Sequence, residues 1–170
     1  RATLAEAWDA ALACDNVSAF GGIFICNRSV DLATATAIDE LFYEVLIAPE
    51  FDEDALALLR KKSNRILLQI KDFFVRSRSF RSLLNGVVEQ DADLKTETAS
   101  DLKNATKATP SLTEIDDLLF ANKCVKHLKS NAIALVKNRQ LMGMGCGQPS
   151  RVDALRQAIA KSKSFGFDLQ

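Results

Sequence analysis

The 170-residue sequence has few of the residues that bind metals or cross-link chains. It contains one histidine, His127, and its four cysteines form no C-x-x-C pair. A zinc site built from cysteine and histidine is therefore not expected, and neither is a disulfide framework at this length. We interpret the cysteines as small buried hydrophobic residues of a protein from a reducing compartment, which predicts a cytoplasmic location. They are Cys14, Cys26, Cys124 and Cys146.

The sequence also lacks an excess of charge of one sign and a long apolar run. Basic and acidic residues both number 22, so the positive field that non-specific nucleic-acid binding needs is missing. No apolar run approaches the roughly 18 residues that cross a bilayer, and residues 1–4 show no secretory pattern. Nucleic acid and membranes are thus not expected as partners, although a local cluster can still bind a small anion. Without an initiator methionine, we expect the sequence to begin inside a larger protein or after a processing site.

Hydrophobic residues make up 48% of the chain, a fraction typical of a globular protein. In the first 70 residues, segments with helical spacing alternate with short apolar runs. The pattern predicts helices over 4–14, 31–42 and 52–62, and strands over 23–26, 45–48 and 65–70. This alternation is typical of a layered α/β fold with some parallel pairing. Arg60, Lys61 and Lys62 are expected in the last turn of the third helix, where cations favour the helix dipole.

The middle of the chain carries weaker signals. Residues 71–82 show no clear period, residues 86–90 predict a further strand, and residues 91–109 are polar and are interpreted as a loop or linker. Ser111 and Glu114 then form a capping box at the start of a helix. We expect the inward residues of that helix to be Ile115, Leu118, Leu119, Val125 and Leu128.

The last third predicts a β-hairpin followed by a helix. The two strands are expected over 132–136 and 140–144, and Ser150 is expected to cap the helix. Val152, Leu155 and Ile159 have the spacing of an inward face.

Residues 143–151 are the most informative segment, because Gly143, Gly145 and Gly147 alternate at the end of a strand and before a helix. Alternate glycines clear one face of a strand, so a ligand or another backbone can approach closely. Arg151 stands in the first helical turn, where its charge opposes the dipole unless an anionic group lies nearby. Two interpretations stay open: glycines packed against a helix beside a solvated arginine, or an anion-binding helix start. The motif is neither a Walker loop nor G-x-G-x-x-G and names no ligand.

Three further positions are candidates for a site. Asn131 lies between the helix and the hairpin, and is either a turn residue or a donor aimed at a substrate oxygen. Residues 18–22, Ser-Ala-Phe-Gly-Gly, offer a second place for close backbone approach, or a plain turn. Glu44 precedes an apolar run and is either exposed or binds hydroxyl groups or an amine.

Residues 14–23, Cys-Asp-Asn-Val-Ser-Ala-Phe-Gly-Gly-Ile, resemble a segment of the transformylase half of the bifunctional purine-biosynthesis enzymes. Those enzymes join AICAR formyltransferase to IMP cyclohydrolase. The resemblance continues through 44–49 and 117–121 and is strongest over 125–133 and 143–152. It covers nearly the whole chain, in order and with matching spacing.

The resemblance implies transfer of a formyl group from 10-formyltetrahydrofolate, as co-substrate, to AICAR ribonucleotide in IMP biosynthesis, without zinc. Asn131 is then the candidate catalytic residue, because an amide donor helps most where charge develops. By motif match, the positions that contact AICAR are Gly21, Glu44, Asn131 and Arg151, and the positions beside the folate are Phe20 and Val152.

The resemblance also implies cytidine-deaminase-like α/β units, with active sites shared across a homodimer. We expect 1–90 to be part of the first unit, 91–129 a linker and connecting helix, and 130–170 the start of the second unit. The family's catalytic Lys-His pair matches nothing here and is expected upstream of Arg1, with a further segment beyond Gln170, so the chain alone is expected to be inactive. The alternative is a non-catalytic nucleotide-binding or dimerising α/β domain.

Overall fold

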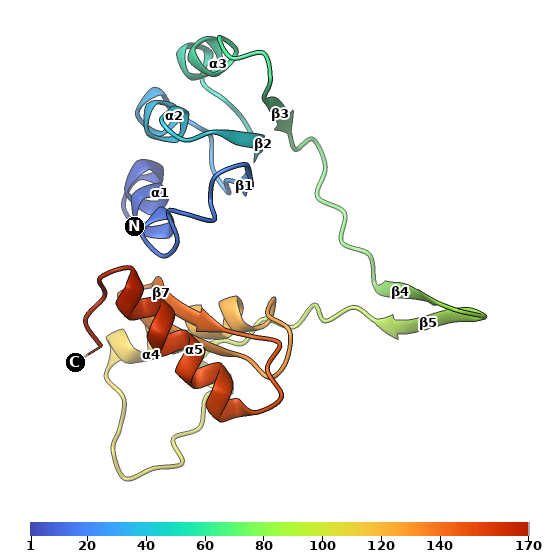
Figure 1. Cartoon of the computed structure of the whole chain (residues 1–170), viewed down its shortest axis with the longest axis vertical. Coiled ribbons are helices and arrows are strands. Elements are labelled where there is room, and N and C mark those ends of the chain that lie inside the picture. The colour runs from blue at the N-terminus through green and yellow to red at the C-terminus, as the bar shows by residue number, and fades with distance from the viewer. Residues whose placement is uncertain (170) are drawn as a thin grey trace.

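The computed structural model describes residues 1–169, which form two layered regions joined by an extended segment (Figure 1). The N-terminal region, residues 1–70, is a parallel sheet covered by helices on one face. The C-terminal region, residues 111–169, is an antiparallel β-hairpin between two helices. Within residues 1–169, no helix is both long and apolar enough to span a bilayer.

All six elements predicted for the N-terminal region are present, which confirms the α/β class. They are α1 (Leu4–Leu12), β1 (Gly22–Ile25), α2 (Leu32–Asp39), β2 (Tyr43–Ala48), α3 (Glu53–Leu59) and β3 (Ile66–Gln69). The strands pair in the order β1-β2-β3, all parallel. Local chemistry fixes the helix starts: Thr3 and Glu6 form a capping box for α1, and the Asp31 carboxylate accepts a hydrogen bond from the Thr34 amide at 2.8 Å.

Helices α1, α2 and α3 cover the same face of the sheet (Figure 1) and bury its core against them. The fully buried core residues are Val30, Ala35, Ile38, Tyr43, Leu46, Ala48, Ala55 and Leu59. Side chains that alternate with the core residues point to the other face, where Ile23 and Ile25 are each 66% exposed. Because parallel sheets are usually covered on both faces, this face is open within residues 1–169.

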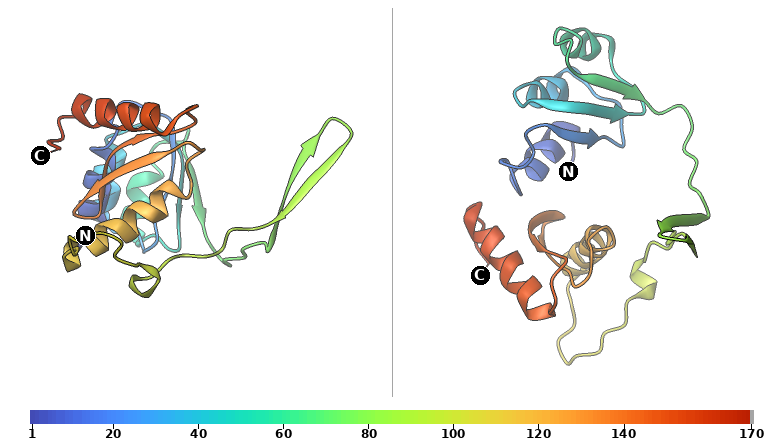
Figure 2. Two further views of the ribbon diagram at one scale, coloured as in Figure 1. Left: turned by 90° about the horizontal axis from the view of Figure 1, so that it is seen from below. Right: turned by 45° about the vertical axis from the view of Figure 1, so that its right-hand side comes forward.

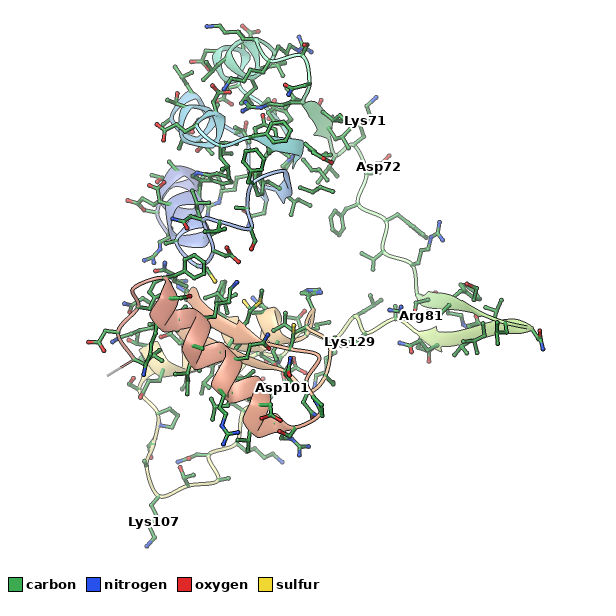
Figure 3. All side chains as sticks on the ribbon, viewed as in Figure 1. Lys71, Asp72, Arg81, Asp101, Lys107 and Lys129 are labelled. Atoms are coloured by element: carbon green, nitrogen blue, oxygen red, sulfur yellow. The ribbon has the colours of Figure 1, made fainter. Side chains whose placement is uncertain are left out.

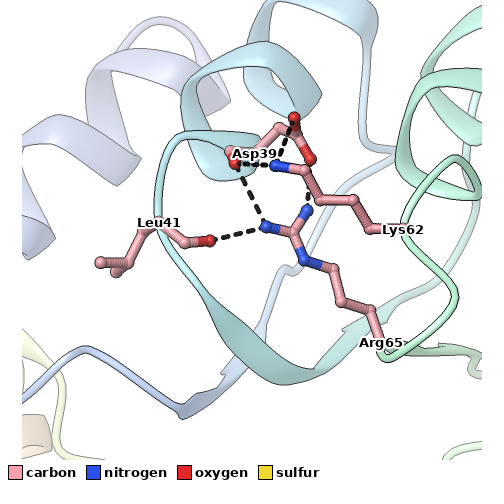
Figure 4. A network of polar contacts seen from close by, with 4 residues as sticks. All are labelled: Asp39, Leu41, Lys62 and Arg65. Atoms are coloured by element: carbon pink, nitrogen blue, oxygen red, sulfur yellow. Dashed lines mark hydrogen bonds and ion pairs between the residues drawn. The ribbon is translucent and has the colours of Figure 1, made fainter.

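The cations expected in the last turn of α3 are placed differently, and that prediction is wrong. The helix ends at Leu59, and no basic residue lies in its last turn. Lys62 and Arg65 instead reach the carboxylate of Asp39 at the end of α2, with Lys62 Nζ 3.0 Å from Oδ2 (Figure 4). Arg65 also donates to the Leu41 carbonyl at 2.9 Å and lies over the Tyr43 ring. A half-buried carboxylate is a stronger partner than a helix dipole, so these cations bind α2 to the start of β3.

This cluster also sets the charge state of Asp39. Burial raises the pKa of the carboxyl group, but hydrogen bonds from Lys62 and Arg65 outweigh burial and leave it below its ordinary value. The carboxylate therefore stays charged and keeps both cations in place.

An isolated hairpin, here called the hairpin arm, follows the N-terminal region. It consists of β4 (Arg78–Leu83) and β5 (Gly86–Asp91), paired antiparallel. The strand over 86–90 was predicted, whereas β4 was not, because its residues are exposed on both faces and lack apolar alternation. Figure 2 shows the arm projecting away from both regions, and Figure 3 labels Arg81 on it. Residues 92–109 are irregular, as expected, except for the short turn η1 (Ala99–Asp101).

The C-terminal region contains α4 (Leu112–Val125), β6 (Ile133–Lys137), β7 (Gln140–Gly145) and α5 (Arg151–Ser164). The capping box of Ser111 and Glu114 is confirmed, and so is the hairpin, whose turn residues Asn138 and Arg139 both have positive φ. Helix α4 packs against β6, and α5 packs against β7. Leu118 is 51% exposed, so its predicted inward position is wrong: its side chain lines an open pocket beside β6, whereas Ile115 and Leu119 are partly buried.

Helix α5 buries a row of small residues, and the predicted inward face is wrong at two positions. Ala154, Ala158 and Ser162 are fully buried, whereas Val152 and Leu155 are 55% and 40% exposed. The reason lies in β7, where Cβ atoms added at Gly143 and Gly145 would come well inside 3.0 Å of the α5 backbone. The helix approaches the strand so closely that only small residues fit between them.

The two regions meet where α1 and the loop after it face β7 and α5. Gln140 Nε2 donates to the Ala10 carbonyl at 2.8 Å, and Arg1 Nη2 donates to Gln140 Oε1 at 3.0 Å. Asp15 pairs with Lys161 of α5. The hydrogen bond from Lys161 is the largest cause that lowers the pKa of Asp15 to about 2, so this ion pair is present throughout the neutral pH range.

Candidate functional site

The first group of candidate residues lies at the start of β1 and β2. Gly21 has φ of 73°, and its amide donates to the Phe42 carbonyl at 2.9 Å. A Cβ atom there would meet only the Phe42 ring, at 3.9 Å, so the glycine is required by the backbone conformation and leaves open space in front of it. Phe20 is 68% exposed, and its ring centroid lies 5.2 Å from that of Phe42.

Glu44 lies at an irregularity of the sheet beside this group. Gly22 pairs with Tyr43 and Ile23 pairs with Val45, so Glu44 has no partner residue on β1 and forms a bulge. The side chain is exposed, between the buried Tyr43 and the half-buried Val45. Bulges of this kind re-aim a side chain and are common next to active sites. The bulge therefore presents one free carboxylate at the open end of β1 and β2.

The second group lies around Asn131, at the start of β6. The Asn131 side-chain Nδ2 donates to the carbonyls of Gln148 and Pro149, each at 3.0 Å. Its backbone amide also donates to the Gln148 carbonyl, at 3.2 Å. Both side-chain N–H groups are therefore engaged within the chain, so a donor aimed at a substrate oxygen is not available in this arrangement. Within residues 1–169 the Oδ1 atom accepts no hydrogen bond. It is therefore the side-chain atom of Asn131 that can accept a hydrogen bond from a ligand.

Arg151 and Val152 begin α5 next to this loop. The Ser150 hydroxyl accepts from the Asp153 amide at 3.1 Å and donates to the Asp153 carboxylate at 2.6 Å, which confirms the predicted cap. Gly147 has φ of 68°, and its amide donates to the carbonyl of Lys129, labelled in Figure 3, at 2.7 Å. Arg151 is exposed and forms no hydrogen bond or ion pair in the described part of the chain. Its guanidinium is thus free at a helix start, where the helix dipole disfavours a positive charge unless an anionic group is bound nearby.

The structure brings the candidates together in two groups and leaves the groups apart. Phe20, Gly21 and Glu44 belong to the N-terminal region, and Asn131, Arg151 and Val152 to the C-terminal region. No hydrogen bond, ion pair or ring contact joins them within residues 1–169. Phe42 and Gln148, which support the two groups, could not be identified from the sequence, because an aromatic residue before a strand and a polar residue in a loop have many other uses.

The residues that could bind a metal are scattered. Among residues 1–169 there is no group of three or more His, Cys, Asp or Glu side chains placed to hold an ion. All four cysteines are free, and burial is the largest cause that raises the pKa of Cys14, Cys26 and Cys124. These thiols are therefore protonated at neutral pH and behave as small apolar groups.

Curated relatives match almost the whole chain. The bifunctional purine biosynthesis protein PurH of Bacteroides thetaiotaomicron is 55% identical over 169 residues, which are 99% of this chain and 33% of that protein. The protein of the same name from Chlorobium phaeobacteroides is 48% identical over 98% of this chain and 32% of its own length. PurH of Persephonella marina is 44% identical over 97% of this chain and 32% of its own length. The chain thus spans about a third of the length of these relatives.

The comparison with protein families agrees with these relatives. Residues 1–161 match the family described as the AICARFT/IMPCHase bienzyme. The match includes both groups of candidate residues and the hairpin arm. On the extent of this match, together with the identity to PurH proteins, the chain belongs to the AICARFT/IMPCHase bienzyme family.

Proposed function

We propose that the protein containing this chain transfers a formyl group from 10-formyltetrahydrofolate to the 5-amino group of AICAR ribonucleotide in purine biosynthesis. Membership of the bienzyme family supports the reaction, and the names of the relatives support the pathway. We further propose that this chain supplies part of the substrate site, and that the remaining two thirds of the protein complete it.

The observation that carries this proposal is the free guanidinium of Arg151. A cation at the first position of a helix is unfavourable by itself, but a bound anionic group reverses the sign of that contribution. Arg151 then binds an anionic or strongly polar group of AICAR through its forked donors. Gly21 admits the nucleotide close to the backbone, and the Glu44 carboxylate accepts hydrogen bonds from hydroxyl or amine groups of the substrate.

Asn131 takes a different role from the one expected from the sequence. Since both of its N–H groups are engaged, Oδ1 accepts a hydrogen bond from the 5-amino group of AICAR and orients its lone pair toward the formyl carbon. The amine is a poor nucleophile, so orientation lowers the barrier by fixing the attack geometry. Stabilisation of the oxyanion and removal of the proton belong to the Lys-His pair expected elsewhere in the protein.

The folate contacts proposed for this chain are apolar. Phe20 and Val152 are 68% and 55% exposed, so each presents apolar surface to a flat ring system without competing for hydrogen bonds. Because they belong to different regions of the chain, the folate would lie between the two groups of site residues. We propose no zinc in this chemistry, since formyl transfer to an amine needs orientation and charge stabilisation rather than activated water.

The proposed assembly is a homodimer of cytidine-deaminase-like units. Residues 1–90 are part of the first unit, 91–129 connect the units, and 130–170 begin the second. The open face of the sheet, with Ile23 and Ile25, supports further covering by the rest of the assembly. Sharing of sites between subunits would bring together the two groups of residues that have no contact here.

Calorimetric titration of AICAR ribonucleotide into the full-length protein tests the proposal through Arg151→Lys. Lysine keeps the charge but loses the planar forked donors, so we expect binding to weaken by about 1–3 kcal/mol. The matched control is Arg156→Lys on the same helix, where the guanidinium contacts Asp153 at 3.4 Å. Equal affinity of the Arg151 variant, the control and the unaltered protein would show that Arg151 is a solvated surface residue.

A further inference from the structure

A cavity of about 560 Å³ lies where the two regions meet, here called the junction cavity. One wall is helix α1 with the loop that follows β1, and the opposite wall comes from α4 and the turn between β6 and β7. Its floor is apolar, formed by residues such as Leu4, Ala7 and Ala11 of α1 and by Phe120 and Leu141. The volume lies within the range of small-molecule sites.

Four cationic side chains line this cavity: Arg1, Arg28, Lys123 and Arg139. None of them forms an ion pair with another residue of the range 1–169. The Arg1 side chain donates one hydrogen bond, to Gln140. The side chains of Arg28, Lys123 and Arg139 form no hydrogen bond within residues 1–169. In a chain of zero net charge, this is a local accumulation of uncompensated positive charge.

Two carboxylates beside the residues that line the cavity are already engaged. Among residues 1–169, Asp15 is the one acidic residue that lines the cavity, and it pairs with Lys161. Asp117 accepts hydrogen bonds from the backbone amides of Asn138 and Arg139. These four exposed cations therefore have no counter-charge within residues 1–169, and a bound anion would supply one.

Arg139 adds an independent observation. It has φ of 52° at the second position of a two-residue turn, where glycine is strongly preferred because a side chain costs about 1–2 kcal/mol in this conformation. The turn itself gains nothing from an arginine, since its contacts to Asp117 are made by the backbone. What the arginine adds is a guanidinium on the wall of the cavity.

We propose that the junction cavity binds a small molecule with a multivalent anionic group of the phosphate class, whose organic part lies on the apolar floor. Guanidinium groups bind phosphate oxygens through two parallel donors. Gly21, Glu44, Asn131 and Arg151 do not line this cavity, so the site is separate from the one proposed for AICAR. Because Arg28 belongs to the N-terminal region and Lys123 and Arg139 to the C-terminal region, the anion bridges the two regions.

Calorimetric titration of inorganic pyrophosphate into the full-length protein, with AICAR present at saturation, tests the charge of the site. We expect the double variant Arg28→Gln/Lys123→Gln to bind pyrophosphate at least tenfold more weakly, which is about 1.4 kcal/mol. The matched control is Lys103→Gln/Lys107→Gln in the linker, where Lys107 lies far from the junction (Figure 3); its affinity should stay within about twofold. Equal affinity of the two double variants, or no binding to the unaltered protein, would overturn the proposal.

Two further variants separate this site from folding and from the AICAR site. Arg139→Gly relieves the backbone cost and keeps both amide donors, so the thermal midpoint should rise while pyrophosphate affinity falls several-fold. Arg151→Gln should leave pyrophosphate affinity unchanged even if it abolishes AICAR binding. A variant at Arg139 with unchanged affinity, or loss of pyrophosphate binding in the Arg151 variant, would contradict a separate junction site.

Discussion

Gly21, just before β1, and Gly143 and Gly145, in the last part of β7, are glycines for different physical reasons. At the start of β1, Gly21 has a positive φ, and open space lies in front of it. At the end of β7, Gly143 and Gly145 have ordinary backbone angles, and the backbone of α5 fills the space that side chains would occupy. A glycine near a strand end thus indicates either a close approach or an unusual backbone conformation. The glycine alone does not distinguish a ligand from a neighbouring helix.

The same difference extends to the cores of the two regions. The N-terminal region buries large side chains, including Tyr43, Ile38 and Leu46, between sheet and helices. The C-terminal region buries the small side chains Ala154, Ala158 and Ser162 between β7 and α5. The first arrangement fills the core with large side chains, and the second brings two backbones together. The same substitution, glycine to alanine, should therefore change the free energy of unfolding by different amounts in the two regions.

The largest expected effect is that of Gly145→Ala. The added methyl group would overlap the carbonyl of Ala154, so α5 must move away from β7, at a cost of about 3 kcal/mol or more. Urea denaturation measures the free energy of unfolding. Gly86→Ala on the hairpin arm, where no atom lies within 4 Å of the added Cβ, is the matched control and should be neutral or slightly stabilising.

Gly21→Ala should have a smaller effect. The new methyl group meets nothing closer than 3.9 Å, so only the positive φ is unfavourable, and the expected cost is about 1–2 kcal/mol. Gly21→Asn should cost less than Gly21→Ala, because asparagine tolerates this conformation. Both can be measured by the same denaturation experiment. A loss as large as that of Gly145→Ala would mean that the two strand ends do not differ as described.

A smaller effect again concerns the ion pair between the regions. The pKa of Asp15 is about 2 in the folded chain and about 3.9 in an unfolded one. Because the folded value is lower, its contribution to stability is complete above the unfolded value and is lost as the pH falls from about 4 toward 2. Asp15→Asn should cost on the order of 1–2 kcal/mol at pH 7 and much less near pH 2. A cost that does not change over this pH range would show that the pair does not stabilise the junction.

Much of the fold could be predicted because local signals agreed with the tertiary structure. Ser111 and Ser150 cap helices as expected, and the apolar runs form strands. The inward face of α5 could not be predicted, because hydrophobic spacing selects Val152 and Leu155, whereas the nearby glycines require alanines. The hairpin arm carries no apolar alternation that would reveal β4.

The candidate site, like the fold, could be predicted from the sequence only in part. The sequence identified residues that the structure leaves free, such as Arg151 and Glu44, since an uncompensated charge at a helix start or before a strand is visible in the pattern. It did not identify the bulge at Glu44, which depends on the register between β1 and β2. The engagement of the Asn131 amide depends on where the loop with Gln148 folds back, and no local pattern specifies that.

The central claim is that the two separate groups of residues bind the same AICAR molecule. Amide hydrogen exchange on the full-length protein, followed over a titration with AICAR ribonucleotide, tests this most directly. The account predicts that residues 20–24 and 43–46 and residues 146–152 are all protected, with the same AICAR concentration at half effect. The hairpin arm, residues 78–91, should show no change with that midpoint. Protection of only one group, or two clearly different midpoints, would contradict a single site built from both regions.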